Sequence, residues 1–498
     1  MDRYIQYMYS YPHKTAYRPL HHVSLGDYTE NLEGEGHSLY LHLPFCESKC
    51  GYCNLFSATG CGKEFQDAYL DALDRQVKQY GEILPKGASF GDFTVGGGTP
   101  LLLDAGRLEQ MFRMVRAYMP LEENCDIVIE TAPKQTDREK ARLLKDWGVR
   151  RVSMGIQSFE EKELAWLGRR HDGRRAQEAA EILMDMGFAC VNFDFIYGLP
   201  GQTRESLLGS LERAVSFSPD EIFLYPLYIK HGVRLEGDGK GEMLDSDHTY
   251  SLYRHGAAYL KEQGYAQISM RRFVGKKNSA KTFGNLRGEF RECGFTGALS
   301  LGCGGRSYLG RLHACTPYRT TRQGVLEEIR KYCGREDFLS VTHGILLSDE
   351  ELRRRYVIKH LLIRPGISEK AYGRCFGTRV TEDFPILKTW MDMGWVQDAR
   401  GSGKGDGPAA GHREGPCPED MRAGGGWDGP HGGAGAPQGG RPDGGEGDGF
   451  ISLTEEGMGL SDYIGPQLIS EDIRKKMLEW ERMNGKEDNL LSGEPEKL

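Results

Sequence analysis

The chain of 498 residues lacks several features that would decide its class at once. No window approaches ~18 consecutive apolar residues, so no membrane-spanning helix is predicted. Basic residues do not predominate: 64 Lys and Arg stand against 72 Asp and Glu, and the net charge of −8 argues against a nucleic-acid-binding surface. The first residues, MDRYIQYMYSYPHK, lack the charged head, apolar stretch and cleavage site of a secretory signal. We therefore expect a cytoplasmic location, where cysteines stay reduced and serve as ligands or core residues.

The cysteines are unevenly distributed. Of the twelve, four lie within sixteen residues, and Cys46, Cys50 and Cys53 share one loop after the first predicted strand. Three thiolates so close in sequence can bind one soft metal centre. A structural zinc site would need a fourth ligand, and the nearest is Cys61. A [4Fe–4S] cluster held by three cysteines leaves one iron open. The spacing therefore favours an iron–sulfur cluster on Cys46, Cys50 and Cys53.

Short apolar runs alternate with helical patterns between Ser38 and Lys230. The predicted strands cover 39–43, 90–95, 126–129, 151–156, 191–196 and 222–227, and helical spacing follows most of them. Six such strand–helix units predict an α/β fold with a parallel sheet that curls into a partial (β/α)6 TIM-like barrel. Chemistry in such folds gathers at the carboxyl ends of the strands.

The remaining segments suggest five parts. Residues 1–37 form an N-terminal strap, 38–270 the barrel, and 271–345 an extension with the glycine-rich stretch LSLGCGGRSYLG. Residues 346–398 and 450–480 read as a small α-rich domain. Between them, 401–449 holds 19 Gly and 6 Pro with scarcely an apolar residue, so we expect 399–449 to be a disordered insert. Gln397 and Ile451 would then be arms of one hairpin, because a long loop costs little closure entropy.

Several motifs recur in one order along the chain. They are YLHLPFCESKCGYC at 40–53, GGGTP at 96–100, Glu130, MGIQSF at 154–159, LGRRH at 167–171 and NFDFIYGLPGQT at 192–203. Together they resemble the radical S-adenosylmethionine (SAM) superfamily, and within it the oxygen-independent coproporphyrinogen III oxidase-like (HemN/HemW-like) family. The resemblance covers about residues 38–390 and resumes at 450. It implies a radical SAM barrel with a winged-helix-like C-terminal domain, and two cofactors, a [4Fe–4S] cluster and SAM.

The resemblance also assigns SAM contacts to residues with physical reasons of their own. Glycines at a strand end permit close backbone approach to a ligand, although a plain tight turn would also use them. Asp194 interrupts an apolar strand, where a carboxylate needs a partner. For the two tyrosines, core packing is an equal alternative. The implied SAM-binding residues are Tyr40, Tyr52, Gly97, Gly98, Thr99, Glu130, Gln157, Arg169 and Asp194.

The resemblance further implies a reaction. An external electron donor of the flavodoxin or ferredoxin type reduces the cluster, SAM is cleaved to a 5′-deoxyadenosyl radical, and the radical abstracts hydrogen from a small-molecule substrate. That substrate would be tetrapyrrole-like or otherwise carboxylated, with oxidative decarboxylation if the chain is a coproporphyrinogen dehydrogenase. The alternatives are a haem-binding and delivery chaperone of the HemW type and a radical SAM methyltransferase.

The sequence departs from the family at two places. Coproporphyrinogen oxidases carry a fourth cysteine two residues after the third, where this chain has Leu55. The haem-chaperone branch has a His-Asn-x-x-Tyr-Trp type stretch, where residues 290–295 read FRECGF. These departures predict a separate subgroup whose substrate the resemblance does not fix.

Basic and aromatic residues outside the motifs suggest further roles. Lys14 and Arg18, in an aromatic stretch before the barrel, would either offer charge to substrate carboxylates or pack on the barrel exterior. Arg306 and His313 accompany the glycine-rich loop, where a structural role for the histidine is favoured. The run 353–355 (RRR) is most simply a solvated helix face.

Overall fold

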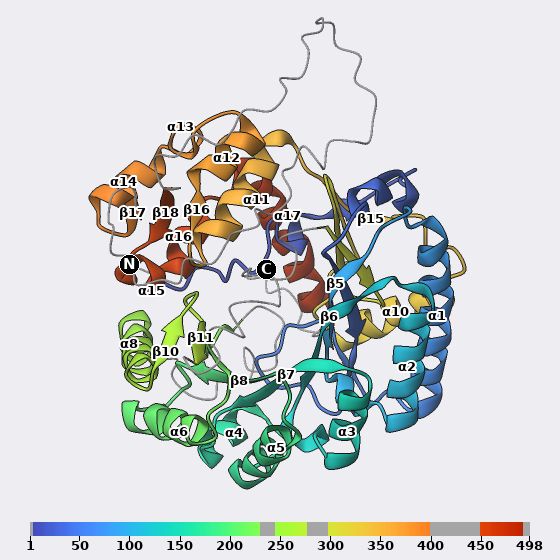
Figure 1. Ribbon diagram of the computed structural model, residues 1–498, viewed down its shortest axis with the longest axis horizontal. Helices are drawn as coiled ribbons and strands as arrows, with labels where there is room; N and C mark the ends of the chain where they lie inside the picture. The colour runs from blue at the N-terminus through green and yellow to red at the C-terminus, as the bar shows by residue number, and fades with distance from the viewer. Residues whose placement is uncertain (1–2, 230–244, 276–296, 399–448, 492–498) are drawn as a thin grey trace, which may run out of the picture.

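The computed structural model describes residues 3–229, 245–275, 297–398 and 449–491, with side chains up to 484 (Figure 1). The segment 399–448 and the stretch 290–295 lie outside these ranges, so the disorder expected for the first is not tested.

Six parallel strands follow the order of the chain at the centre of the sheet. They are β2 (His37–Leu43), β5 (Phe90–Gly97), β6 (Leu121–Thr131), β7 (Val149–Gln157), β8 (Cys190–Tyr197) and β9 (Glu221–Pro226). The connecting helices lie outside the curved sheet in Figure 1: α1 (Lys63–Ile83), α2 (Ala105–Tyr118), α3 (Arg138–Asp146), α4 (Glu161–Leu167), α5 (Gly173–Met186) and α6 (Arg204–Ser216). Each predicted strand overlaps one of the six, and the α/β fold with a mainly parallel sheet is confirmed.

Local sequence explains these elements. Strand β8, CVNFDFIY, is buried at every position except Asp194, as expected of a strand covered on both faces. Side chains of Asp104, Asp172 and Thr203 accept backbone N–H groups at the starts of α2, α5 and α6. Gly187 ends α5 in the left-handed conformation. Helices therefore start and stop where the barrel needs its turns.

The extension 271–345 continues the barrel sheet at both edges. Strand β12 (Ala298–Leu301) pairs in parallel with β2, followed by antiparallel β13 (Arg306–Leu309), β14 (Leu312–Cys315), β15 (His343–Leu346) and β1 (Arg18–Pro19). At the other edge β11 (Arg272–Gly275) follows β9 and pairs with β10 (Tyr265–Gln267). Helix α8 (Ser246–Glu262) precedes β10 within the range predicted for the barrel, and α10 (Arg322–Cys333) lies in the extension. The glycine-rich stretch forms the β12–β13 hairpin.

The C-terminal part is a helical domain with a three-stranded sheet. Its helices are α11 (Asp349–Leu361), α12 (Glu369–Phe376), α13 (Val380–Asp383), α14 (Ile386–Asp392), α15 (Glu455–Gly459), α16 (Ser461–Gln467) and α17 (Glu471–Leu491). Strand β18 (Phe450–Leu453) lies between β16 (Ile367–Ser368) and β17 (Val396–Asp398). Gln397 faces Ser452 and Asp398 faces Ile451, which confirms the predicted hairpin.

Nine of the cysteines in the described residues are free thiols.

The N-terminal strap packs into the C-terminal domain. Tyr11, Ala16 and Tyr17 are buried in the same apolar cluster as residues of α11, α14 and α16. Arg18 donates to the backbone oxygens of Thr15, Tyr17 and Lys476, the last of these in α17. Arg18 is therefore committed to structural bonds, and the strap joins the two ends of the chain.

A buried ion pair fastens this C-terminal domain to the barrel. Arg271, next to β11, pairs with Asp462 of α16, and both side chains are at most 5% exposed. Tyr228 also donates to Asp462, and the Arg271 guanidinium lies 3.7 Å from the ring centre of Tyr7. Breaking such a pair leaves an uncompensated buried charge.

We predict that Asp462→Asn lowers the free energy of unfolding by about 3 to 5 kcal/mol. The control is Asp247→Asn. The Asp247 carboxylate pairs with Arg3 but is 85% exposed, so this substitution should lower the free energy of unfolding by less than about 1 kcal/mol. Urea denaturation of both variants measures the difference. Equal losses would show that Asp462 is not a buried charged anchor.

We also predict that deleting 401–448 preserves the fold. The deletion leaves a connection of about four residues between the paired Asp398 and Ile451, a common hairpin length. Loop-closure entropy then predicts a gain of up to about 2 kcal/mol in the free energy of unfolding. Loss of cooperative unfolding in a denaturant titration would contradict the insert interpretation.

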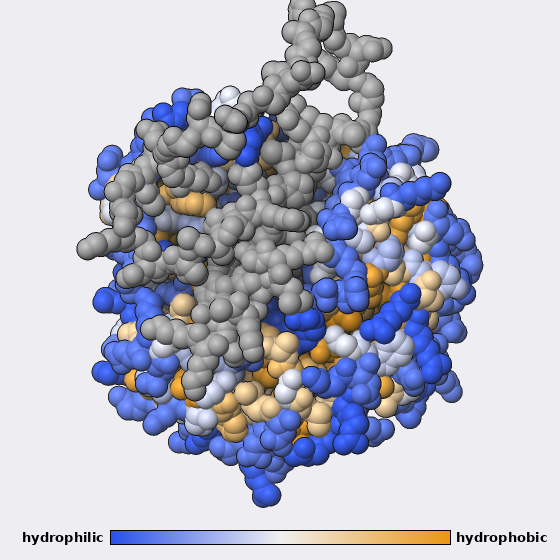
Figure 2. Space-filling view, viewed as in Figure 1, coloured by the Kyte–Doolittle hydropathy of each residue, from blue (hydrophilic) through white to orange (hydrophobic). Residues whose placement is uncertain are grey.

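In the described residues, none of the helices is sufficiently long and apolar to cross a bilayer. On the face drawn in Figure 2, hydrophilic side chains cover most of the outer edge, and hydrophobic side chains gather nearer the middle of the face.

Candidate active site

The cysteine loop leaves the barrel directly after β2. Cys46 ends β3 (Phe45–Cys46), which pairs in parallel with β4 (Ala58–Thr59), so both ends of the loop are fixed. Within the loop, the Cys53 N–H donates to Cys50 O (3.1 Å), and the Gly51 N–H donates to Leu167 O (3.0 Å) at the end of α4. The cysteines are thus held in a short loop that rests on the end of α4.

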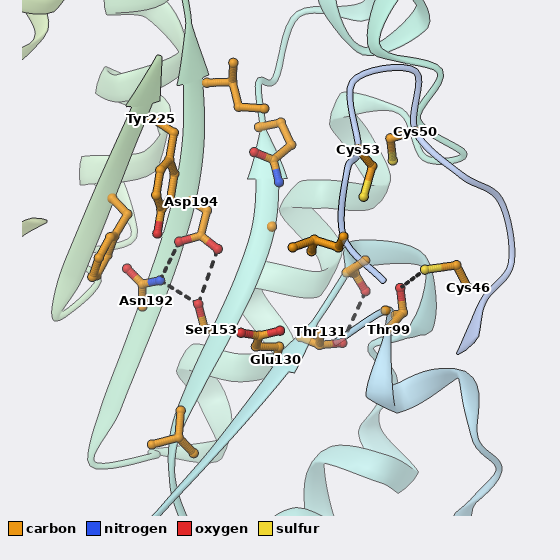
Figure 3. Close-up of a pocket in the computed structure, with 18 of the residues that line it drawn as sticks. Cys46, Cys50, Cys53, Thr99, Glu130, Thr131, Ser153, Asn192, Asp194 and Tyr225 are labelled. Atoms are coloured by element: carbon orange, nitrogen blue, oxygen red, sulfur yellow. Dashed lines mark hydrogen bonds between the residues drawn. The ribbon is translucent and has the colours of Figure 1, made fainter. Parts of the chain in front are cut away.

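The three thiols are free and line one cavity, yet they face different partners. Cys46 Sγ lies 3.8 Å from Thr99 Oγ1, and Cys50 Sγ accepts from Arg169 Nη1 at 3.3 Å. Figure 3 shows Cys50 and Cys53 side by side and Cys46 turned toward Thr99. Among the described residues, no three Cys, His, Asp or Glu side chains are grouped closely enough to hold a metal ion. Side-chain rotation must therefore accompany metal binding.

The chemistry of the donor set nonetheless fits a cluster. All three cysteines belong to one eight-residue segment, and soft thiolates are the ligands that iron–sulfur clusters use. Burial, and then the neighbouring Cys50, raise the pKa of Cys53 to about 11. The free thiol is therefore neutral, and a metal that binds it displaces its proton.

A cavity of about 760 Å³ opens at the carboxyl ends of the strands. Seven of the nine predicted SAM-binding residues line it together with the cysteines: Tyr52, Gly98, Thr99, Glu130, Gln157, Arg169 and Asp194. They come from the loops after β2 and β5, the ends of β6 and β7, the loop after α4 and the middle of β8. Residues far apart in sequence therefore line one open cavity (Figure 3).

The glycine motif brings the β5 turn against the cysteine loop. Thr99 N–H donates to Phe45 O and Gly98 N–H to Leu43 O, each at 2.8 Å. A Cβ on Gly98 would stand 2.5 Å from Phe45 O and 2.9 Å from Cys46 Sγ. The glycine is required for this close approach, because a side chain there would displace the loop that carries the first ligand.

Two carboxylates in the cavity have raised pKa values. Burial, opposed by a bond from Gly97 N–H (3.2 Å), raises the pKa of Glu130 to about 7. Burial, opposed by bonds from Asn192 Nδ2 (2.8 Å) and Ser153 Oγ (3.3 Å), raises the pKa of Asp194 to about 6. Cavity walls that hold partly desolvated carboxylates are suited to a ligand with cationic and hydroxyl groups.

We predict that Glu130→Gln stabilises the ligand-free chain at alkaline pH. Because the folded-state pKa of Glu130 is raised, folding binds protons, and its contribution to stability is lost as pH rises from about 4.5 to 7. Removing the charge should raise the free energy of unfolding at pH 8 by up to about 3 kcal/mol, and by little at pH 4. Denaturant titrations at both pH values measure this; an equal change at each pH would contradict it.

Arg169 and Gln157 complete the wall next to the cluster loop. Arg169 donates to Cys50 Sγ and to Gly155 O, and its neighbour Arg170 is exposed at the cavity. Gln157 has a φ of +74°, a left-handed conformation that a non-glycine residue keeps only where the surrounding structure holds it. Tyr52 also packs against Leu167 and its apolar neighbours.

Tyr40 and Gly97 are not among the residues that line the cavity. Tyr40 Oη is 3.2 Å from His42 Nδ1, and His42 Nε2–H donates to Phe56 O (2.8 Å) at the far end of the cysteine loop. Burial lowers the pKa of His42 to about 4, so the ring is neutral while it makes these two hydrogen bonds. The backbone N–H of Gly97 donates a hydrogen bond to the Glu130 carboxylate. Direct contact of either residue with SAM stays a prediction.

The residues singled out beside the motifs separate into two groups. Lys14 lines the cavity, with its ammonium 3.7 Å from the ring centre of Tyr318. Arg306 donates to Ser10, and His313 is fully buried against Tyr17 and Tyr308. The structural role favoured for His313 agrees with this burial.

Sequence reasoning missed two features of the cavity. The first is a buried charge cluster at its floor, where Glu221 forms ion pairs with Arg151 (2.6 Å) and Arg272. The sequence signal that could have predicted this cluster is the presence of Arg151 and Arg272 in or beside apolar strands. The second is an aromatic wall formed by Tyr7, Tyr225 and Tyr228, whose pattern in the sequence matches ordinary core packing.

Comparisons with known proteins agree with this architecture. Residues 40–214 match the model of the radical SAM superfamily. The solved structure of coproporphyrinogen III oxidase HemN from Escherichia coli superposes with a TM-score of 0.70 at 20% identity and covers 93% of this chain and 96% of that one. The fold and the matched segment define a protein with a radical SAM domain, a class that uses a [4Fe–4S] cluster and SAM.

Curated relatives place the chain more narrowly. It is 32% identical to heme chaperone HemW of E. coli over 234 residues (46% of this chain) and 33% identical to HemW of Mycobacterium tuberculosis over 240 residues (47%). It is 25% identical to the oxygen-independent coproporphyrinogen III oxidase of E. coli over 376 residues, 72% of this chain and 79% of that protein. The chain is therefore homologous to both the HemW and the oxidase proteins. The first two matches span only 60% and 61% of the HemW proteins.

Proposed function

We propose that the chain is a radical SAM enzyme that abstracts hydrogen from a carboxylated, tetrapyrrole-like small molecule. The observation that carries this proposal is the single cavity of about 760 Å³, which the three cysteines share with seven of the residues expected to bind SAM. The residues proposed to hold the cluster and those proposed to contact SAM thus line one continuous cavity. Such proximity is what a short-lived radical requires.

The chain's own residues would bind and orient SAM. Cys46, Cys50 and Cys53 would hold the cluster, which supplies the electron that cleaves SAM to methionine and a 5′-deoxyadenosyl radical. Asp194 would accept hydrogen bonds from the ribose hydroxyls, and Glu130 would accept hydrogen bonds from the cationic amino end of SAM. Arg169, already within bonding distance of Cys50, is suited to the SAM carboxylate.

The substrate class is supported by charge at the cavity mouth and by the relatives. Lys14, Lys49 and the exposed Arg170 line the cavity and offer cationic groups to carboxylates. One relative is named for coproporphyrinogen III, a tetracarboxylated tetrapyrrole precursor. We propose further that an external flavodoxin- or ferredoxin-type protein supplies the electron and that the chain works in the cytoplasm.

A haem-binding and delivery role is the second candidate. Two observations favour it: the HemW names of the relatives with 32% and 33% identity, and Leu55. Leu55 lines the cavity mouth with half of its surface exposed, at the place where the oxidases carry a fourth cysteine. A chain without that thiol can retain the SAM site and act on, or carry, a different molecule.

One set of assays separates the candidates. The protein is reconstituted with iron and sulfide without oxygen, reduced, and given SAM together with coproporphyrinogen III or haem. Release of 5′-deoxyadenosine that rises with coproporphyrinogen supports the oxidase-like activity. Stoichiometric haem binding without such a rise supports delivery, and S-adenosylhomocysteine indicates methyl transfer. Absence of 5′-deoxyadenosine under every condition would refute the radical proposal.

A further inference from the structure

Glu163 is a buried carboxylate beside the active site that the proposed mechanism does not use. It lies in α4, is 7% exposed, and does not line the cavity. Its oxygens accept from Ser158 Oγ (2.6 Å), Ser206 Oγ (2.7 Å) and Gln202 Nε2 (3.1 Å). No Lys, Arg or His of the described ranges pairs with it, so neutral donors alone stabilise the carboxylate.

The first donor belongs to the end of β7. Ser158 directly follows Gln157, the residue with a φ of +74° that lines the cavity. A non-glycine residue is strained in this conformation, and the conformation persists only where its neighbours hold it. The bond from Ser158 to Glu163 fixes the backbone at this point.

The second donor belongs to the turn after β8. Gln202 Oε1 accepts from Gly198 N–H at 2.8 Å, and Gly198 follows the strand that carries Asp194. The third donor, Ser206, lies in the first turn of α6. Glu163 thus joins the turns that follow two neighbouring strands of the barrel.

The helix that carries Glu163 also leads to the cysteine loop. Helix α4 ends at Leu167, whose carbonyl accepts from Gly51 N–H. Two residues later Arg169 donates to Cys50 Sγ. Any shift of α4 would move this arginine relative to Cys50.

We propose that Glu163 is a positioning residue that fixes the positions of Gln157, Arg169 and the cysteine loop relative to one another. This inference rests on the proposed function only in that the positioned residues bind SAM and the cluster. Glu163 touches neither, and it acts through Ser158, Gln202, Ser206 and the fixed end of α4.

The matched control is Glu351 in α11. This carboxylate is also 7% exposed and accepts from Ser470 Oγ (2.6 Å) and Tyr11, but it lies in the C-terminal domain. Glu163→Gln and Glu351→Gln therefore make the same chemical change at the same degree of burial. A milder variant, Ser206→Ala, removes one donor to Glu163 and keeps its charge.

Two measurements test the proposal. In the metal-free chain, alkylation of Cys50 by iodoacetamide should be about tenfold slower in Glu163→Gln, because the Arg169 guanidinium that stabilises the reactive thiolate is displaced. It should be slower by a smaller factor in Ser206→Ala and unchanged in Glu351→Gln. In the reconstituted protein, Glu163→Gln should bind SAM about tenfold more weakly, with a smaller SAM-induced change in the electron paramagnetic resonance spectrum at unchanged iron content.

The outcomes separate this inference from the proposed function. A wild-type rate of Cys50 alkylation in Glu163→Gln, or an equally slowed rate in Glu351→Gln, would overturn the positioning role. If the wild-type chain binds no SAM, the proposed function fails, and the alkylation rates alone still decide the role of Glu163.

Discussion

Replacing any one of the three loop cysteines is expected to abolish the cluster. Cys46→Ala, Cys50→Ala and Cys53→Ala each leave two thiols, too few to hold a cluster with one open iron. After oxygen-free reconstitution, each variant should show less than about a tenth of the wild-type iron and sulfide, and no SAM cleavage. Iron and sulfide analysis with visible absorption measures this directly.

Cys61→Ala is the matched control. Cys61 lies eight residues beyond Cys53 as a free, partly buried thiol and does not line the cavity. It should leave the cluster intact, whereas a zinc site of four ligands would lose its metal. A variant of Cys46, Cys50 or Cys53 that retains wild-type iron would remove that residue from the ligand set.

The next largest effect is expected at Asp194. Because bonds from hydroxyl groups to a carboxylate contribute about 1.5–3 kcal/mol each, loss of two from the ribose predicts SAM binding weaker by at least about 100-fold in Asp194→Ala. Burial raises the pKa of Asp194 to about 6, so wild-type SAM binding should also weaken as pH falls below about 6. Equilibrium dialysis with labelled SAM from pH 5 to pH 8 tests both statements.

Asp220→Asn provides the comparison, because Asp220, just before β9, bonds to the other end of β8. Asp220 is buried and accepts from Val191 N–H (2.8 Å), the second residue of β8. This variant should lose stability while keeping wild-type SAM affinity. Equal weakening of SAM binding by both variants would assign the effect of Asp194 to damage of the strand.

The barrel and most of its site were predictable because they depend on local sequence. Apolar runs followed by helical spacing located all six parallel strands, and the polar Asp194 stood out within NFDFIYGLP. The spacing of Cys46, Cys50 and Cys53 carried the metal hypothesis without any knowledge of the fold. The contact of these residues with SAM stays a prediction.

The features that sequence reasoning missed depend on distant contacts. Glu163 belongs to the run EEKEL, which is typical of a solvated helix start, and its donors at 158, 202 and 206 lie on separate turns. Tyr11 and Tyr17 enter a core made by residues more than 300 positions later. The short run ALSL gives no sign that β12 pairs with β2. In each case, burial is decided by tertiary packing, which local periodicity does not encode.

The central claim is that Cys46, Cys50 and Cys53 hold a cluster whose fourth iron binds SAM. The most direct test is Mössbauer spectroscopy of the wild-type chain reconstituted with ⁵⁷Fe, before and after addition of SAM. We predict a [4Fe–4S] spectrum in which one iron site alone changes on SAM binding. A spectrum without a cluster, or one that SAM leaves unaltered, would contradict the claim.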